Sequence, residues 1–173
     1  MRRTIQKALG ALLLALLLGG LGGCKVQYSF TGASISPDVK TVSVAHFPNI
    51  APLVTAGFSA QFTEALKRRF MTQTSLGVVE ANGDLQFSGE IVDYSVTPTA
   101  IQGNEMAAMN RLTIAARVVY TNLKDKEANF ERTFSAYEDF PSDQSVTQVE
   151  GDLLPKIIEK LVDDIFNASV ANW

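Results

Sequence analysis

Cysteine and histidine are nearly absent from this chain of 173 residues, and their scarcity excludes most kinds of site chemistry. A zinc site needs three or four nitrogen or sulfur ligands, whereas the chain has one histidine, His46, and one cysteine, Cys24. A Ser-His-Asp or Cys-His site would have to use His46, which falls on a predicted apolar strand face where a hydrogen-bonded structural role is favoured. We therefore expect no catalytic residue, no metal and no bound cofactor.

Basic residues are also few. The chain has 15 lysines and arginines against 18 acidic residues, and three of the basic residues but none of the acidic ones precede Cys24. The part from Cys24 onward therefore carries a net charge of about −6, which argues against nucleic-acid binding and against electrostatic docking on anionic lipid. The acidic pairs Glu90/Asp93, Glu138/Asp139 and Asp163/Asp164 fit solvated surface charge better than acid–base catalysis.

What the first residues do contain is a targeting pattern. Three basic residues, an apolar run over 8–18 and the small residues of Leu21-Gly22-Gly23 precede Cys24. This pattern is typical of a secretory signal, and it is too short and glycine-rich for a comfortable membrane-spanning helix. Its small-small-Cys ending resembles a bacterial lipobox. We interpret 1–23 as a lipoprotein signal peptide and Cys24 as the acylated first residue. The alternative is an ordinary secretory signal with an incidental free thiol, an unusual residue in an oxidising compartment.

Acylation of Cys24 would supply the membrane attachment that the charge does not. Stable anchoring needs at least two acyl chains. A cysteine that carries palmitate-type acyl chains on its sulfur and on its amino group would exceed this number. Lys25 follows the cysteine, so the aspartate of the enteric inner-membrane retention signal is absent. By the sorting rules of such lipoproteins, this predicts the periplasmic face of the outer membrane.

The remaining residues, 24–173, have the length of one domain. Periodicity predicts strands at Val39–Phe47, Leu85–Thr97, Arg111–Thr121 and Asn129–Glu138, and helices at Phe58–Phe70 and from Ser145 to Ile165. Pro155 interrupts the last helix, which should kink there or, as we favour, break into two. The order β-α-β-β-β-α predicts an α+β fold: a two-layer α/β sandwich with a four-stranded mixed sheet covered on one face by two helices.

The segment Pro98–Asn110 is long for a connection between neighbouring strands. It carries Ile101, Met106 and Met109, and methionines on a loop suit adaptable apolar contacts. The alternative is that both strands extend further into a long hairpin, whose tip would then be the functional part.

Several runs resemble LptE-family lipopolysaccharide-assembly lipoproteins, in the form found in Bacteroidetes. The most specific is Tyr-Ser-Phe-Thr-Gly-Ala-Ser-Ile over Tyr28–Ile35, and the others are Val39–Val42, Phe47–Asn49, Gln61–Leu66, Tyr94–Pro98, Asn110–Ile114, Phe134–Tyr137 and Ile157–Trp173. The resemblance covers nearly all of 24–173 and implies a single LptE-like domain with two helices on a four-stranded sheet.

The resemblance also implies a non-enzymatic role in lipopolysaccharide transport and membrane assembly. Such proteins plug the barrel of the outer-membrane protein LptD, assist its assembly and bind lipopolysaccharide. The implied partners are therefore an LptD-type barrel, lipopolysaccharide and the membrane through the acyl lipid on Cys24. The candidate ligand or barrel contacts are Ile101, Met106, Met109 and Arg111. The alternative is a free-standing periplasmic lipid-binding lipoprotein, which requires a sizeable apolar pocket between sheet and helices.

Overall fold

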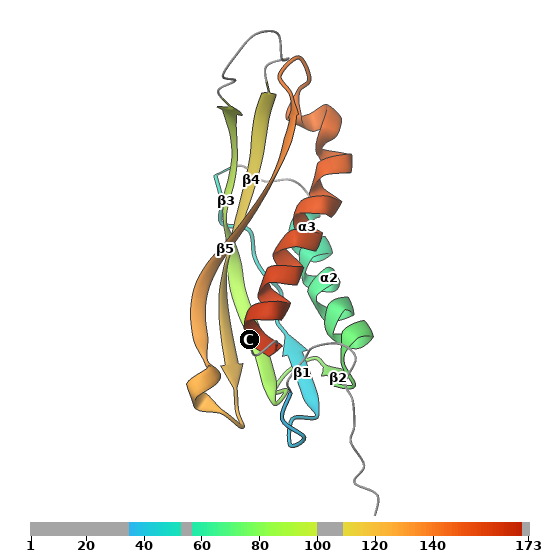
Figure 1. Ribbon diagram of the computed structural model, residues 1–173, viewed down its shortest axis with the longest axis vertical. Coiled ribbons are helices and arrows are strands. Elements are labelled where there is room, and N and C mark those ends of the chain that lie inside the picture. Colours follow the sequence, from blue (N-terminus) through green and yellow to red (C-terminus); the bar gives the residue numbers. More distant parts are fainter. Residues whose placement is uncertain (1–34, 53–56, 100–108, 171–173) are drawn as a thin grey trace, which may run out of the picture. The chain divides into compact units, whose positions relative to one another are not determined.

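A computed structural model of the chain describes residues 35–52, 57–99 and 109–170. They form a mixed sheet with two helices packed against it (Figure 1). The strands are β1 (Thr41–Val44), β2 (Gly77–Val79), β3 (Leu85–Thr99), β4 (Met109–Asn122) and β5 (Phe130–Pro141). The helices are α2 (Phe58–Gln73) and α3 (Val146–Val170), and a 3-10 turn, η1 (Lys126–Ala128), precedes β5.

The sheet has five strands in the order β2-β1-β3-β4-β5, so the expected four-stranded sheet is wrong. The missed strand, β2, has three residues, which is too short to show an alternating pattern. It pairs in parallel with β1, and β1 pairs in parallel with β3. The last three strands form an antiparallel meander, in which β4 lies between β3 and β5.

The helices are also arranged differently from the expectation. The crossover helix α2 leads first to the edge strand β2, and only then does the chain pass to β3 on the other side of β1. Contacts divide the sheet between the helices, because α2 packs on β1 and β2 while α3 packs on β5 and β4. The two helices also pack against each other, as Figure 1 shows.

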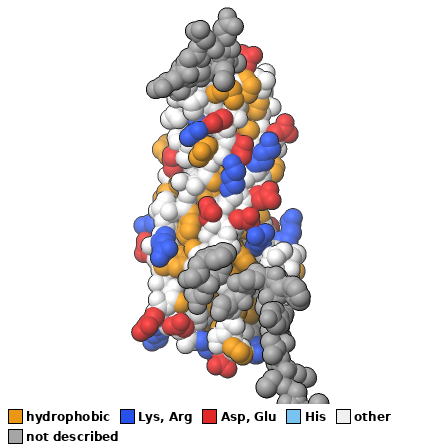
Figure 2. Space-filling view, viewed as in Figure 1, with side chains coloured by type: hydrophobic (Ala, Val, Ile, Leu, Met, Phe, Trp, Pro, Cys, Tyr) orange, Lys and Arg blue, Asp and Glu red, His pale blue; other side chains and the backbone are white. Residues whose placement is uncertain are grey.

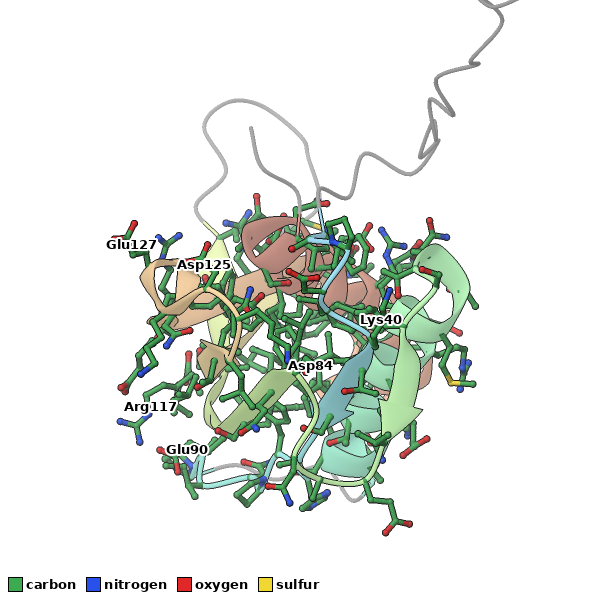
Figure 3. The ribbon with its side chains drawn as sticks, turned by 90° about the horizontal axis from the view of Figure 1, so that it is seen from below. Lys40, Asp84, Glu90, Arg117, Asp125 and Glu127 are labelled. Atoms are coloured by element: carbon green, nitrogen blue, oxygen red, sulfur yellow. The ribbon has the colours of Figure 1, made fainter. Side chains whose placement is uncertain are left out.

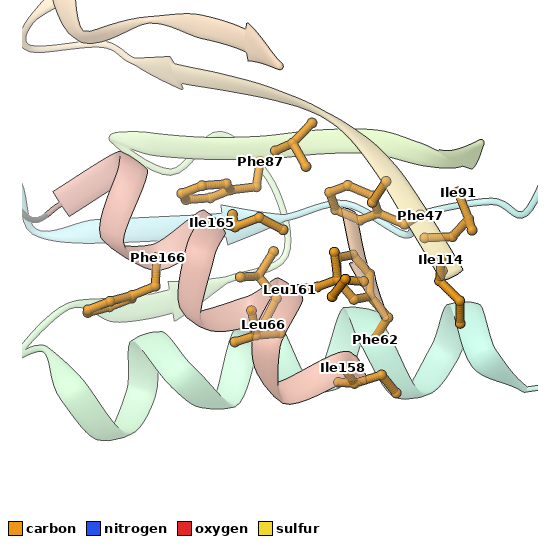
Figure 4. Packing of buried hydrophobic residues seen from close by; sticks show 14 of the residues in the cluster. Phe47, Phe62, Leu66, Phe87, Ile91, Ile114, Ile158, Leu161, Ile165 and Phe166 are labelled. Atoms are coloured by element: carbon orange, nitrogen blue, oxygen red, sulfur yellow. The ribbon is translucent and has the colours of Figure 1, made fainter. Parts of the chain in front are cut away.

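Large apolar side chains fill the space between the helices and the sheet (Figure 4). Aromatic rings connect the layers: Phe70 of α2 lies 4.9 Å from Phe87 of β3, and Phe87 lies 4.9 Å from Tyr120 of β4, measured between ring centroids. Burial raises the pKa of the Tyr120 phenol to about 12, because the charged phenolate would be desolvated there. On β4, alternation points Leu112, Ile114, Ala116 and Val118 towards the helices, and all four are fully buried.

The alternation of buried residues changes phase along β3. The pairing with β4 shifts between Ile91 and Asp93, whereas Gly89 stays in phase with the buried Phe87. Position 89 requires a glycine. Its φ is +153°, and a Cβ there would lie 2.0 Å from the Arg117 carbonyl oxygen and 2.8 Å from the Phe47 ring.

The last helix is continuous from Val146 to Val170 with Pro155 inside it, so the favoured break is wrong. Pro155 is exposed, whereas Leu153, Leu154, Ile157 and Ile158 on either side of it are buried. Packing of these neighbours keeps the chain helical despite the lost backbone hydrogen bond. A side-chain cap stabilises the start of the helix, because the Ser145 N–H donates to Gln148 Oε1 at 2.8 Å.

Candidate functional site

The connection between β3 and β4 is shorter than the sequence suggests. β3 continues to Thr99 and β4 begins at Met109, and these two residues are paired. Each strand thus extends two residues beyond its predicted end, in the direction of the long-hairpin interpretation. Cys24, Ile101 and Met106 lie outside the described residues, so their proposed roles stay predictions.

Met109 and Arg111 are the two candidate residues that the structure does place, at the start of β4. The Met109 carbonyl accepts a hydrogen bond from Thr99 Oγ1 at 2.9 Å, and Met109 also lies opposite Pro141 of β5. Met109 is therefore held between its two neighbouring strands, and it belongs to the paired end of the hairpin.

Arg111 lies on the sheet face away from the helices, because it alternates with the buried Leu112. Its guanidinium makes a two-pronged contact with Asp139 of β5: Nε donates to Oδ1 at 2.8 Å and Nη2 donates to Oδ2 at 3.0 Å. The same guanidinium lies 3.6 Å above the ring centroid of Tyr137. We call Arg111, Tyr137 and Asp139 the hairpin clamp, since they join β4 to β5 near the β3–β4 connection.

Electrostatics in the hairpin clamp favour the charged forms of both partners. The hydrogen bonds from Arg111 lower the pKa of the Asp139 carboxyl, and the same bonds to Asp139 raise the pKa of Arg111. Arg111 is consequently not a vacant anion site. A phosphate or carboxylate ligand would have to compete with Asp139 for the guanidinium.

Sequence reasoning missed Tyr137 and Asp139 because their partnership with Arg111 depends on strand register. Asp139 lies directly opposite Arg111 in the β4–β5 ladder. Arg111 and Tyr137 each fall within a predicted strand. A shift of one residue in the register between the strands would bring residues of the other face opposite Arg111. The available signal was an arginine and a tyrosine in adjacent predicted strands, with an aspartate one residue beyond the second strand, and many registers could satisfy it.

A second polar cluster lies at the other end of the sheet, around Asp84. Its Oδ2 accepts hydrogen bonds from the backbone N–H groups of Lys40 and Thr41 at 2.9 and 3.1 Å, and Lys124 Nζ lies 3.2 Å from Oδ1. Figure 3 shows Asp84 beside Lys40 at the start of β1. These contacts, above all the Lys40 backbone bond, lower the pKa of Asp84 to about 2. The carboxylate joins the starts of β1 and β3 to the segment that follows β4.

Another group of charged side chains on the sheet forms ion pairs that are typical of a surface. On the open face Arg117 bonds to Glu90 and lies 3.6 Å from Glu131; Figure 3 shows Arg117 and Glu90 on neighbouring strands. Figure 2 shows basic and acidic side chains interspersed over the face in view. Within the ranges that the structure describes, no three potential metal ligands cluster, and no helix is long and apolar enough to cross a membrane. His46 is exposed just beyond β1, so its expected place on an apolar strand face is wrong.

Two hollows on the described surface lie outside the apolar core that fills the space between the helices and the sheet. One, of about 710 Å³, is a groove between α2 and α3 on the side away from the sheet, and another, of about 500 Å³, lies between the edge of β5 and α3. Between the layers, Phe62, Leu66 and Leu161 have no exposed surface. This filled core does not favour the alternative of a free-standing lipid-binding protein.

Comparison with known proteins decides the family. The family model LptE, described as lipopolysaccharide-assembly, matches residues 39–169. The chain belongs to the LptE family. It is therefore a non-enzymatic lipoprotein of the cell envelope with a role in lipopolysaccharide assembly. No curated protein matches the chain.

Solved structures of several bacterial lipoproteins are similar to this LptE-family chain. A minor lipoprotein from Acinetobacter baumannii is 14% identical, with 75% of this chain and 91% of that chain covered and a TM-score of 0.48. Rare lipoprotein B from Shewanella oneidensis is 9% identical, with 75% and 90% covered and a TM-score of 0.45. Lipoprotein B from Nitrosomonas europaea is 14% identical, with 83% and 88% covered and a TM-score of 0.45.

Proposed function

We propose that this protein is the lipid-anchored component of an outer-membrane lipopolysaccharide translocon. In this proposal it hangs from the periplasmic face of the outer membrane by acyl chains on Cys24, plugs an LptD-type barrel and assists its assembly. It also contacts lipopolysaccharide through the β3–β4 end of the sheet. Membership of the LptE family, matched over 39–169, supports the pathway, and the Leu-Gly-Gly-Cys junction supports the anchor.

The single observation that carries the site of contact is the ordered pairing up to Thr99 and Met109. Because β3 and β4 stay paired to these residues, and the hairpin clamp fixes β4 to β5 beside them, the segment 100–108 is attached to a braced end of the sheet. Such a braced end can present Met109 and Arg111 to a partner in a fixed arrangement. The filled core supports a structural partner over a lipid carrier.

A photo-crosslinker placed in living cells tests this proposal. At Met106 or Met109 it should capture a large outer-membrane barrel protein, with or without glycolipid. Lys126 is the matched control, because it lies in η1 at the opposite end of the β4–β5 pair. Capture of the barrel from Lys126 with none from the methionines would mean that the opposite end faces the partner. If neither position captures a barrel and the purified protein binds lipid alone, the lipid-carrier alternative replaces the plug.

The anchor is tested separately. Replacement of Cys24 by Ser should abolish palmitate labelling and release the protein from the membrane fraction, since the thiol is the attachment atom. Unchanged labelling in Cys24→Ser would exclude acylation at this residue.

A further inference from the structure

The outer edge of β5 faces a hollow that the proposed function does not use. This hollow, which we call the β5 trough, has a volume of about 500 Å³ and is lined by Ser135, Ala136 and Tyr137 of β5 and by Lys160, Asp163, Asp164 and Asn167 of α3. In Figure 1 β5 crosses in front of β3 and β4, with α3 beside it. A channel between an edge strand and a helix is the geometry in which other domains accept an added strand.

Backbone groups of β5 point into this trough. The Tyr137 carbonyl accepts a hydrogen bond from Lys160 Nζ at 2.9 Å, so it faces away from β4. In an antiparallel ladder the N–H and C=O of one residue point to the same side, and this direction alternates along the strand. The backbone groups of Ser135 and Thr133 therefore face outward as well. Among the described residues, Lys160 is the only one that bonds to this edge between Thr133 and Tyr137.

Lys160 covers part of the edge. Its ammonium contacts Glu138 Oε1 at 2.6 Å as well as the Tyr137 carbonyl, and about half of its side chain is exposed. A lysine over an edge strand discourages indiscriminate pairing with other chains. Because the lysine stem is long and flexible, an incoming N–H group can take its place at the carbonyl while the ammonium stays near Glu138.

Charge on the helix side of the trough indicates which strand would fit. Asp163 is already paired with Arg69, at 2.9 Å, and Lys160 with Glu138. Asp164 is exposed, and among the described residues it has no ion-pair partner. The unmatched charge facing the trough is therefore negative, which favours a basic side chain on the occupant.

We propose that the β5 trough binds an extended, basic segment of a partner polypeptide, which adds as a sixth strand to the outer edge of β5. Main-chain hydrogen bonds to Thr133, Ser135 and Tyr137 hold the segment, and a lysine or arginine on it faces Asp164. This inference does not depend on which barrel or glycolipid the protein serves.

The test uses the acylated full-length protein in a non-ionic detergent and a synthetic peptide of alternating lysine and valine, about seven residues long. Amide-resolved NMR should show shifts and slowed hydrogen exchange at Thr133, Ser135 and Tyr137, with a Kd of about 1 mM or tighter. The same peptide methylated on all its backbone nitrogens should not bind, and a glutamate–valine peptide should bind several-fold more weakly. Equal binding of the methylated peptide, or no shift at these three amides, would overturn the proposal.

Two variants separate strand addition from general stickiness. Ser135→Pro removes an outward N–H without touching the β4 ladder and should abolish binding, whereas Glu131→Pro, on the same edge but outside the trough, should retain it. Asp164→Lys leaves the backbone intact and should weaken the lysine peptide about threefold while strengthening the glutamate peptide. Unchanged affinity in both Ser135→Pro and Asp164→Lys contradicts the site. If the protein instead dimerises through β5 without peptide, in sedimentation experiments, the occupant is a second copy and the proposal is wrong.

Discussion

The two faces of the sheet are held together in different ways. On the helix face, apolar side chains of the sheet such as Ile114 pack against apolar side chains of the helices such as Phe62 and Leu161 (Figure 4). None of these three side chains has exposed surface. On the open face, Arg117, Arg111 and their acidic partners form ion pairs that remain in contact with water. Burial stabilises by an amount that grows with apolar area, whereas exposed ion pairs contribute little. The helix face therefore determines stability, and the open face can change for binding at small cost.

The largest expected effect comes from breaking the helix face at Ile114. Ile114→Ala should lower the free energy of unfolding by about 2–5 kcal/mol, because it removes buried methyl groups and leaves a cavity under α3. Urea unfolding measures it. Thr113→Ala, next along the strand but on the open face, is the control and should change stability by about 0.5 kcal/mol at most. A cost below that value for Ile114→Ala would contradict the assignment of the inner face.

Pro155 tests the same difference between buried and exposed faces within α3, because it lies on the exposed side of a helix whose other side is buried. Pro155→Ala should raise the free energy of unfolding by about 1–3 kcal/mol, because it restores a backbone hydrogen bond to the Gly151 carbonyl. Gly151→Ala, where a Cβ would meet nothing within 4 Å, should add about 0.5–1 kcal/mol. Thermal and urea unfolding measure both. A loss of stability in Pro155→Ala would mean that the helix depends on the proline's geometry at that turn.

Asp84 tests whether polar contacts at the sheet end contribute to stability. Its pKa in the folded protein, about 2, is below the ordinary value of 3.8, so its contribution is complete above about pH 4 and is lost as pH falls towards 2. Asp84→Asn should therefore reduce stability at pH 7 and weaken the dependence on pH between 4 and 2. Lys124→Ala keeps the backbone hydrogen bonds and should retain most of that dependence. Identical pH curves for Asp84→Asn and the unchanged protein would contradict this role.

The same division explains what the sequence could predict. Periodicity located the strand β4 and the helix α2, because each turns one face to the core and burial imposes a period on that face. The buried residues of these faces are Leu112, Ile114, Ala116 and Val118 on β4 and Phe62 and Leu66 on α2. β2 was missed because three residues carry no period, and Pro155 misled because local propensity was outweighed by packing on both sides of it. Only one residue of the hairpin clamp was predicted from the sequence. Arg111 was chosen for its position, whereas Asp139 and Tyr137 could be predicted only from the exact register of β4 and β5.

The smallest expected change in stability is at Arg111, where a change of function would be most informative. Arg111→Ala should lower stability only slightly, because the pair with Asp139 is exposed. If Arg111 contacts an anionic glycolipid, as proposed, the variant should weaken lipopolysaccharide binding about two- to fivefold. Asp139→Asn should strengthen binding by a similar factor, because it removes the carboxylate that competes for the guanidinium.

The control is Arg117→Ala. Arg117 lies on the same strand and face and has its own acidic partner, so this variant should leave binding unchanged. These affinities can be measured with labelled lipopolysaccharide on the purified protein. Unchanged binding in both Arg111→Ala and Asp139→Asn would make the hairpin clamp a brace for the strands and exclude it as a ligand contact.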